Sequence, residues 1–122
     1  MASDTSKLVI LMTKGIDHEV SSVGFTIANG AITAGMEVLV FLTSAAIDVV
    51  RKKGQAMTHV PPLDPLATMI DSFLARGGRI CACPPCVTAR GYQQSDLLDG
   101  VVIQGASVMF AEFKAGAASL SF

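Results

Sequence analysis

Short apolar runs rich in branched residues recur along the chain and alternate with segments of helical periodicity. Two of these runs, at 7–13 and 36–43, read KLVILMT and MEVLVFLT. Runs of this length and composition are typical of strands that are buried on both faces of a sheet. Between them, residues 20–35 carry apolar side chains at helical spacing, and Gly35 is a good helix stop.

The alternation continues to the end of the chain. The segments expected after residue 43 are a helix at 45–53 capped by Thr43 or Ser44, a loop at 55–65, a helix from Pro65 to Gly77 capped by Asp64, a strand at 79–83, a short helix at 86–90, a strand at 101–104, a helix at 106–114 and a last strand near 119–122. Strands that alternate with helices predict a mostly parallel sheet covered on both faces. We therefore predict one α/β domain over residues 1–122, a flavodoxin-like three-layer α/β/α sandwich with about five strands.

The composition narrows the class of protein. The chain has 122 residues, of which 51% are hydrophobic and 16% charged, and its net charge is −1. It carries no run of lysine and arginine, so we expect no nucleic-acid partner. It has no signal-like start and no apolar stretch long enough for a membrane span. We expect a cytoplasmic protein with reduced thiols, and a homo-oligomer that buries the surplus apolar surface.

All three cysteines lie in one stretch, RICACPPCVTARGY, at 79–92. The stretch begins with the predicted third strand, and its CPPC segment follows that strand; functional groups of parallel α/β sheets collect at the carboxyl ends of strands. The proline pair suits the first turn of a helix, which places Cys83 near the N-cap and Cys86 in the first turn. Thiolates are stabilised at helix N-termini, so Cys83 and Cys86 are the candidate reactive residues.

Three further residues are candidates for a supporting role. Arg90 follows Cys86 by four residues on the same helical face and is placed to hold a thiolate. Lys14 and His18 lie in the loop after the first strand, at the same edge of the sheet. The simpler interpretation is a solvated loop in which Asp17 caps the next helix.

The residues alone leave three uses of the thiols open. Cys83 could accept and pass on a sulfane sulfur, or Cys83 and Cys86 could exchange between dithiol and disulfide. The three thiolates could also hold zinc or copper(I), with His18 or His59 as a fourth ligand for zinc. Structural zinc is the least favoured, because a second ligand cluster is absent, and we assign neither metal nor cofactor. Cys81 is best interpreted as a small buried hydrophobe in a strand.

Several of these segments together resemble the DsrE/DsrF/DsrH-like family of small sulfur-relay proteins. The resemblance extends over most of the chain, through KLVILMTKG, AITAG, MEVLVFLTSAA, GGRICAC, CPPCVTARGY and DGVVIQGASVMFAEF. Its most specific part is a cysteine eight residues before the glycine of an Arg-Gly pair, here Cys83 before Arg90 and Gly91. Members that pass sulfur carry their acceptor cysteine at this place.

The resemblance implies a flavodoxin-like fold and an oligomer built on trimers or hexamers. It also implies a sulfurtransferase-like relay, in which Cys83 takes sulfur from a donor protein as a persulfide and hands it to an acceptor protein. Cys81 and Cys86 are additional to the single cysteine of the family pattern. They keep a CxxC redox protein or sensor, and a metal-binding or structural oligomeric module, as alternatives.

Overall fold

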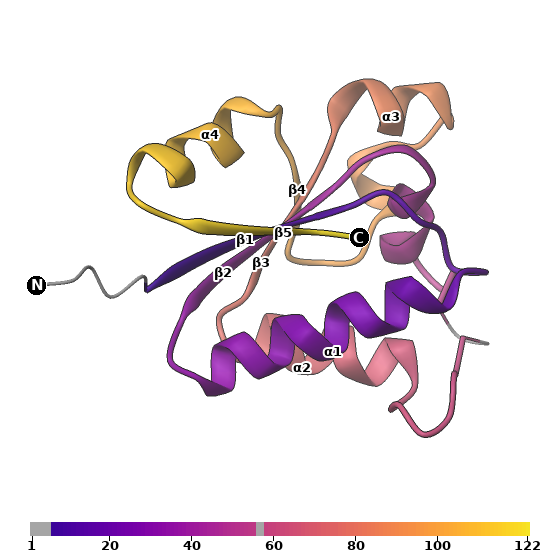
Figure 1. Ribbon diagram of the computed structural model, residues 1–122. Helices are drawn as coiled ribbons and strands as arrows, with labels where there is room; N and C mark the ends of the chain where they lie inside the picture. The colour runs from indigo at the N-terminus through magenta and orange to yellow at the C-terminus, as the bar shows by residue number, and fades with distance from the viewer. Residues whose placement is uncertain (1–5, 56–57) are drawn as a thin grey trace, which may run out of the picture.

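The computed structural model describes residues 6–55 and 58–122, which form a sheet with helices on both sides (Figure 1). Its elements in chain order are β1 (Lys7–Met12), α1 (Glu19–Thr33), β2 (Glu37–Leu42), the 3₁₀ helix η1 (Ser44–Val50), α2 (Leu66–Ala75), β3 (Arg79–Ala82), α3 (Pro84–Ala89), the 3₁₀ helix η2 (Gln94–Asp96), β4 (Val101–Ile103), α4 (Ser107–Lys114) and β5 (Ala118–Ser121).

The five strands are all parallel and lie in the order β4-β3-β2-β1-β5. The chain moves in one direction across the sheet from β1 to β4 and then returns to the far side of β1. Because crossovers between parallel strands are right-handed, this reversal puts α4 on the face opposite α1 and α2 (Figure 1). The predicted α/β class and parallel sheet are confirmed, with a strand order that differs from the 2-1-3-4-5 order of flavodoxin.

The core has two parts, one on each face of the sheet. The larger part lies under α1 and α2 and includes Phe25 and Phe73, whose rings meet edge to face at 5.9 Å between centroids. The smaller part lies under α4 and consists of Val9, Leu39, Phe41 and Cys81. Successive side chains of a strand point to opposite faces, which is why the strands are apolar at almost every position.

Most predicted elements are present, but two of the helix starts differ from prediction. His18, and not Asp17, occupies the N-cap of α1, and its Nδ1 accepts a hydrogen bond of 3.2 Å from the backbone N–H of Val20. Asp64 does not cap α2. Pro65 takes the N-cap position with extended backbone and no side-chain capping bond, so the helix begins at Leu66.

The segment after β2 also differs from prediction. The predicted helix at 45–53 is the 3₁₀ helix η1, and it ends where Arg51 turns into an extended conformation to bridge Leu97. Thr43 stands at its N-cap, but the Thr43 hydroxyl donates to the carbonyl of Met12 at 3.4 Å and caps nothing.

Because all strands are parallel, the segments that follow β1, β2, β3 and β4 emerge at the same edge of the sheet. The cysteine segment is one of them, as predicted. Within the described ranges, no helix is long and apolar enough to cross a membrane.

Candidate functional site

Cys83 is held at the junction of β3 and α3 through its backbone. Its N–H donates to the carbonyl of Leu42 on β2 at 2.9 Å, and its carbonyl accepts from Val87 at 3.0 Å. It occupies the N-cap of α3, and the two prolines fill the first helical positions, as the sequence predicted. The thiol therefore leaves a fixed point of the backbone, where the sheet ends and the helix begins.

The three thiols are free and lie in different surroundings. Cys81 is buried, with 2% of its surface exposed, in the smaller core under α4. Cys83 is half-buried and packs against that same core, because residues two apart in a strand share a face. Cys86 is also half-buried, but it packs against the larger core on the other side of the sheet.

Burial raises the pKa of the Cys83 thiol above its ordinary value. The backbone of Cys86 acts in the opposite direction and lowers this pKa, whereas the neighbouring Cys86 thiol adds to the increase. Because burial dominates, Cys83 needs hydrogen-bond donors if its sulfur is to carry a negative charge.

Burial likewise raises the pKa of Cys81, and the charge of Arg79 offsets only part of this effect. Cys81 is therefore a neutral S–H group at neutral pH. The thiol proton of Cys81 is donated in a hydrogen bond to Oε1 of Gln104 at 3.5 Å.

A row of polar side chains crosses the carboxyl edge of the sheet with Cys83 inside it. The last paired residues of β1, β2, β3 and β4 lie side by side: Met12, Leu42, Ala82 and Ile103. The residues that follow them form the row: Thr13, Thr43, Cys83 and Gln104. Backbone hydrogen bonds extend the pairing to this row: Thr43 donates to Met12 at 3.0 Å, Cys83 to Leu42 at 2.9 Å, and Gln104 to Ala82 at 3.2 Å.

The loops that begin at Cys83 and at Gln104 lead to opposite faces of the sheet. After β3 the chain turns to the α1 side, where Val87 of α3 joins the larger core. After β4 it turns to the other side, where Val108 of α4 packs on the smaller core. In open α/β sheets, ligands bind in the crevice between strand ends whose loops diverge in this way. Gln104 is not among the site residues predicted from the sequence, because its only local signal is a polar residue at the end of an apolar strand.

The predicted supporting residues lie near this edge without bonding to sulfur. Arg90 donates to the carbonyl of Cys86 at 3.4 Å and pairs with Asp48 at 3.8 Å. Lys14 is exposed, and His18 is engaged as the cap of α1. Of the hydrogen bonds formed by the described residues, none joins Arg90, Lys14 or His18 to a thiol.

Tyr92 secures the far end of α3. Its hydroxyl donates to Asp48 at 2.6 Å, and this bond raises the pKa of the phenol. The guanidinium of Arg51 stands 5.4 Å from the centre of the ring. Arg90 pairs with the same carboxylate, so Asp48 ties η1 to α3 at two points and holds the cysteine helix in place.

Among the described residues, the geometry assembles no metal site around the cysteines. His59 lies 3.0 Å from the carbonyl of Leu63, in the loop before α2. Residues 6–55 and 58–122 contain no group of three or more His, Cys, Asp or Glu side chains arranged to bind a metal. A hollow of about 400 Å³ lies along α1 and α2, and none of the cysteines lines it.

Residues 6–122 match the DsrE/DsrF-like family, and the chain belongs to it. A relative of 32% identity is the uncharacterized protein MK0008 of Methanopyrus kandleri, matched over 71 residues. The match covers 58% of this chain and about half of that relative, 55% of its length.

Two solved structures share the fold. MTH1491 of Methanobacterium thermoautotrophicum, a protein of unknown function, superposes with a TM-score of 0.75 at 19% identity, over 98% of this chain and 100% of that one. The ychN protein of E. coli gives a TM-score of 0.72, again at 19% identity and with the same coverage. These likenesses establish the fold and, at this identity, nothing about activity.

Proposed function

We propose that this protein is a sulfur carrier that holds sulfane sulfur as a persulfide on Cys83 and relays it between partner proteins. The family supports sulfur relay as the general class of function. The observation that carries the assignment to Cys83 is its position: a half-buried thiol at the N-cap of α3, at the strand ends where the loops diverge.

The transfer is a displacement at sulfur. The thiolate of Cys83 attacks the outer sulfur of a donor persulfide, R–S–SH. A new S–S bond forms on Cys83, the donor's S–S bond breaks, and the donor leaves as a thiolate. An acceptor thiolate then attacks the outer sulfur on Cys83 and regenerates the Cys83 thiolate. Each step exchanges one S–S bond for another, so no external oxidant or reductant is needed.

Cys86 gives the persulfide a second outcome. Its thiolate can attack the inner sulfur of the Cys83 persulfide, form a Cys83–Cys86 disulfide and release hydrosulfide. The position of the two cysteines supports this step, because Cys83 is the N-cap of α3 and Cys86 lies three residues further on in the same helix, close enough to influence the pKa of Cys83. The same proximity supports the second candidate function, a CxxC redox protein or sensor that alternates between dithiol and disulfide.

Mass spectrometry of the intact reduced protein, after exposure to a sulfane-sulfur donor, tests the assignment. We expect a gain of one sulfur atom that reductant reverses. The gain is lost in Cys83→Ser and kept in Cys86→Ser, because only Cys83 accepts sulfur from the donor. Cys81→Ser serves as the matched control and should load normally. Equal loading of Cys83→Ser would contradict the proposal. A loss of two hydrogens in the wild type, together with no gain of sulfur in Cys86→Ser, would favour the redox function instead.

The relay also needs partners and a suitable compartment. We propose a donor and an acceptor protein that approach the carboxyl edge of the sheet, and the reducing cytoplasm as the location that keeps the thiols free. A homo-oligomer, trimer or hexamer, is part of the proposal. Exposed apolar side chains support it, notably Val102 with 45% and Phe110 with 55% of their surface exposed.

A further inference from the structure

Gln104 and Cys83 stand directly opposite one another on adjacent strands. In a parallel sheet, a pair of residues in this position is joined by two backbone hydrogen bonds. One runs from the N–H of Gln104 to the carbonyl of Ala82, and the other from the N–H of residue 84 to the carbonyl of Gln104. The first is present at 3.2 Å. The second is missing because residue 84 is a proline and has no N–H. The backbone therefore places Gln104 one strand spacing, about 4.8 Å, from Cys83.

The side chains of both residues lie on the same face of the sheet. Cys83 packs against the smaller core under α4. Gln104 reaches the thiol of Cys81, which belongs to that core. The amide of Gln104 and the sulfur of Cys83 therefore share the space above the end of β3.

The amide of Gln104 has a defined orientation. Cys81 is buried and remains a neutral S–H group, so it is a donor. Of the two polar atoms of the amide, only the oxygen can accept a hydrogen bond from a donor. The bond accordingly runs from Cys81 Sγ to Oε1 of Gln104 at 3.5 Å. Nε2, with its two N–H groups, then faces away from Cys81, and within the described part of the chain it forms no hydrogen bond.

The other polar neighbour in the row is a poorer donor. The hydroxyl of Thr43 already donates its one proton to Met12 at 3.4 Å. On the helix side, the backbone of Cys86 lowers the pKa of the Cys83 thiol, so its influence is on the sulfur bonded to Cβ, the inner sulfur of a persulfide. The outer sulfur of a persulfide stands about 2 Å beyond the inner one. A donor on the neighbouring strand is placed to serve an ionised outer sulfur.

We propose that Gln104 is the hydrogen-bond donor to the outer sulfur of the Cys83 persulfide, and that Cys81 is the positioning residue that aims the amide of Gln104. This inference rests on the relay proposed above and assigns roles to two residues outside the CPPC stretch. It explains why a buried thiol, unsuited to attack donors itself, lies two residues before the sulfur carrier.

The test measures the lifetime of the persulfide and, separately, the reactivity of the thiol. The experiment uses the full chain in a Cys86→Ser background, which removes the disulfide route. Persulfide on Cys83 is followed by intact mass after loading from a small-molecule polysulfide, and the thiol by its rate of alkylation with iodoacetamide from pH 6 to 10. Gln104→Met keeps the size of the side chain and removes its donors.

We expect Gln104→Met to shorten the persulfide lifetime by about 3- to 10-fold, the effect of losing a charge-assisted hydrogen bond near solvent. The pH profile of alkylation should stay unchanged, because the amide serves the outer sulfur and not the resting thiol. Cys81→Ala should shorten the lifetime in the same direction, and Cys81→Ser, which retains a donor proton, should restore it. Gln93→Met, at an exposed glutamine outside the row, is the matched control.

The outcomes separate this inference from the relay itself. If the Cys86→Ser chain without further substitution takes up no sulfur on Cys83, the relay fails. If it loads, and Gln104→Met leaves the lifetime unchanged, the relay stands and the role of Gln104 is overturned. A shifted alkylation profile in Gln104→Met would also overturn it, since the residue would then act on the resting thiol. A Cys81→Ser variant no better than Cys81→Ala overturns the positioning role of Cys81.

Discussion

Cys81 and Cys83 lie two residues apart and on one face of the sheet, yet they differ in exposure. Cys81 sits within β3, where β2 and β4 flank it and the smaller core covers it. Cys83 comes one residue after the strand, where that cover ends. The step from the interior of the sheet to its edge therefore separates a buried thiol from a partly exposed one.

This difference predicts the reactivity of each cysteine. A thiol reagent applied to the native reduced protein should modify Cys83 and Cys86, while Cys81, with 2% of its surface exposed, should react only after unfolding. The number of reactive thiols should rise from two to the full three in denaturant. Colorimetric thiol titration with and without denaturant measures both values, and Cys81→Ala should abolish the rise. Rapid modification of Cys81 in the native protein would show that β3 opens.

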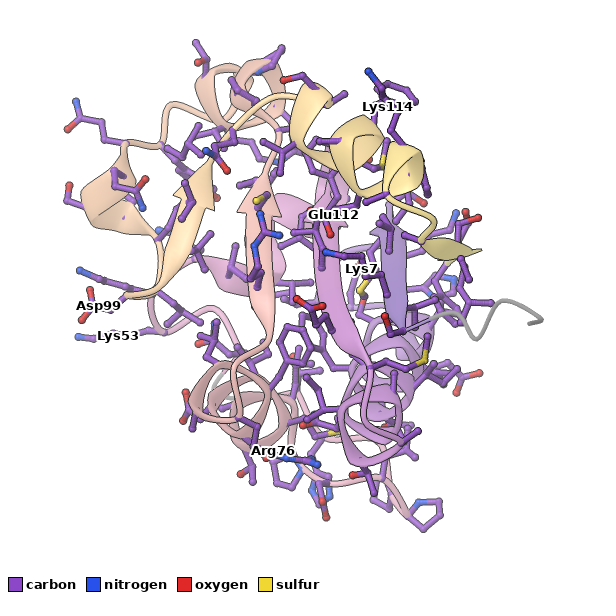
Figure 2. The ribbon with its side chains drawn as sticks, turned by 90° about the vertical axis from the view of Figure 1, so that its left-hand side faces the viewer. Lys7, Lys53, Arg76, Asp99, Glu112 and Lys114 are labelled. Atoms are coloured by element: carbon purple, nitrogen blue, oxygen red, sulfur yellow. The ribbon has the colours of Figure 1, made fainter. Side chains whose placement is uncertain are left out.

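At the level of elements, α4 is secured to the sheet by a carboxylate. Glu112 accepts a hydrogen bond of 3.2 Å from Lys7 on β1 and one of 3.3 Å from Arg79 on β3. Figure 2 shows Glu112 and Lys7 directed toward one another between α4 and the strands. The bond from Lys7 is the main cause of a pKa of Glu112 below its ordinary value. Because α4 also covers Cys81, this pair of bonds helps to keep the smaller core closed.

The lowered pKa determines how this contact depends on pH. A carboxyl group whose pKa falls on folding stabilises the fold above its unfolded pKa, and that contribution disappears as the pH drops through the folded value. Glu112→Gln should therefore lower the free energy of unfolding at pH 7 by less than about 1 kcal/mol, since the three charges are partly solvated. Urea unfolding at pH 7 and near pH 3 measures the difference, which should become smaller as the pH falls.

Glu37 provides the control for this experiment. It lies 3.8 Å from the same Lys7, but 75% of its side chain is exposed. Glu37→Gln should change the stability little at either pH. A difference between wild type and Glu112→Gln that persists in acid would assign the effect to packing and not to charge.

At the level of the whole molecule, the two faces of the sheet are covered unequally. α1 and α2 bury the larger core, whereas α4 is a short helix with no fully buried residue. Val102 on β4 shares the face that α4 covers, because it pairs with Cys81, and it remains exposed together with Phe110 of α4. This uneven cover favours self-association on the α4 side.

We expect the purified chain to have a molecular mass in solution that is a multiple of its own. Phe110→Glu should shift the assembly toward smaller species, because it places a charge where an apolar contact forms. Light scattering coupled to size-exclusion chromatography measures the masses. Ala75→Glu adds the same charge at the exposed end of α2 and should leave the assembly unchanged. A wild-type monomer at micromolar concentration would contradict the oligomer.

The α/β class, the elements and the place of the thiols could be predicted from local patterns. Strands buried on both faces are continuous apolar runs, as in 7–13 and 36–43, and the proline pair marks the start of α3. The capping residues were less predictable. His18 and Asp17 are adjacent and both can cap, and the choice depends on backbone angles that the side-chain types do not encode.

The strand order, the separation of the three thiols and the row around Cys83 required the folded molecule. In the sequence, α3, η2 and β4 lie between Cys83 and Gln104. The two residues become neighbours through the register of β3 and β4. Register is set by how whole elements pack, and a shift by one residue would turn Gln104 to the opposite face. Local patterns thus identify the elements and the cysteine segment, whereas contacts between distant segments determine what surrounds the sulfur of Cys83.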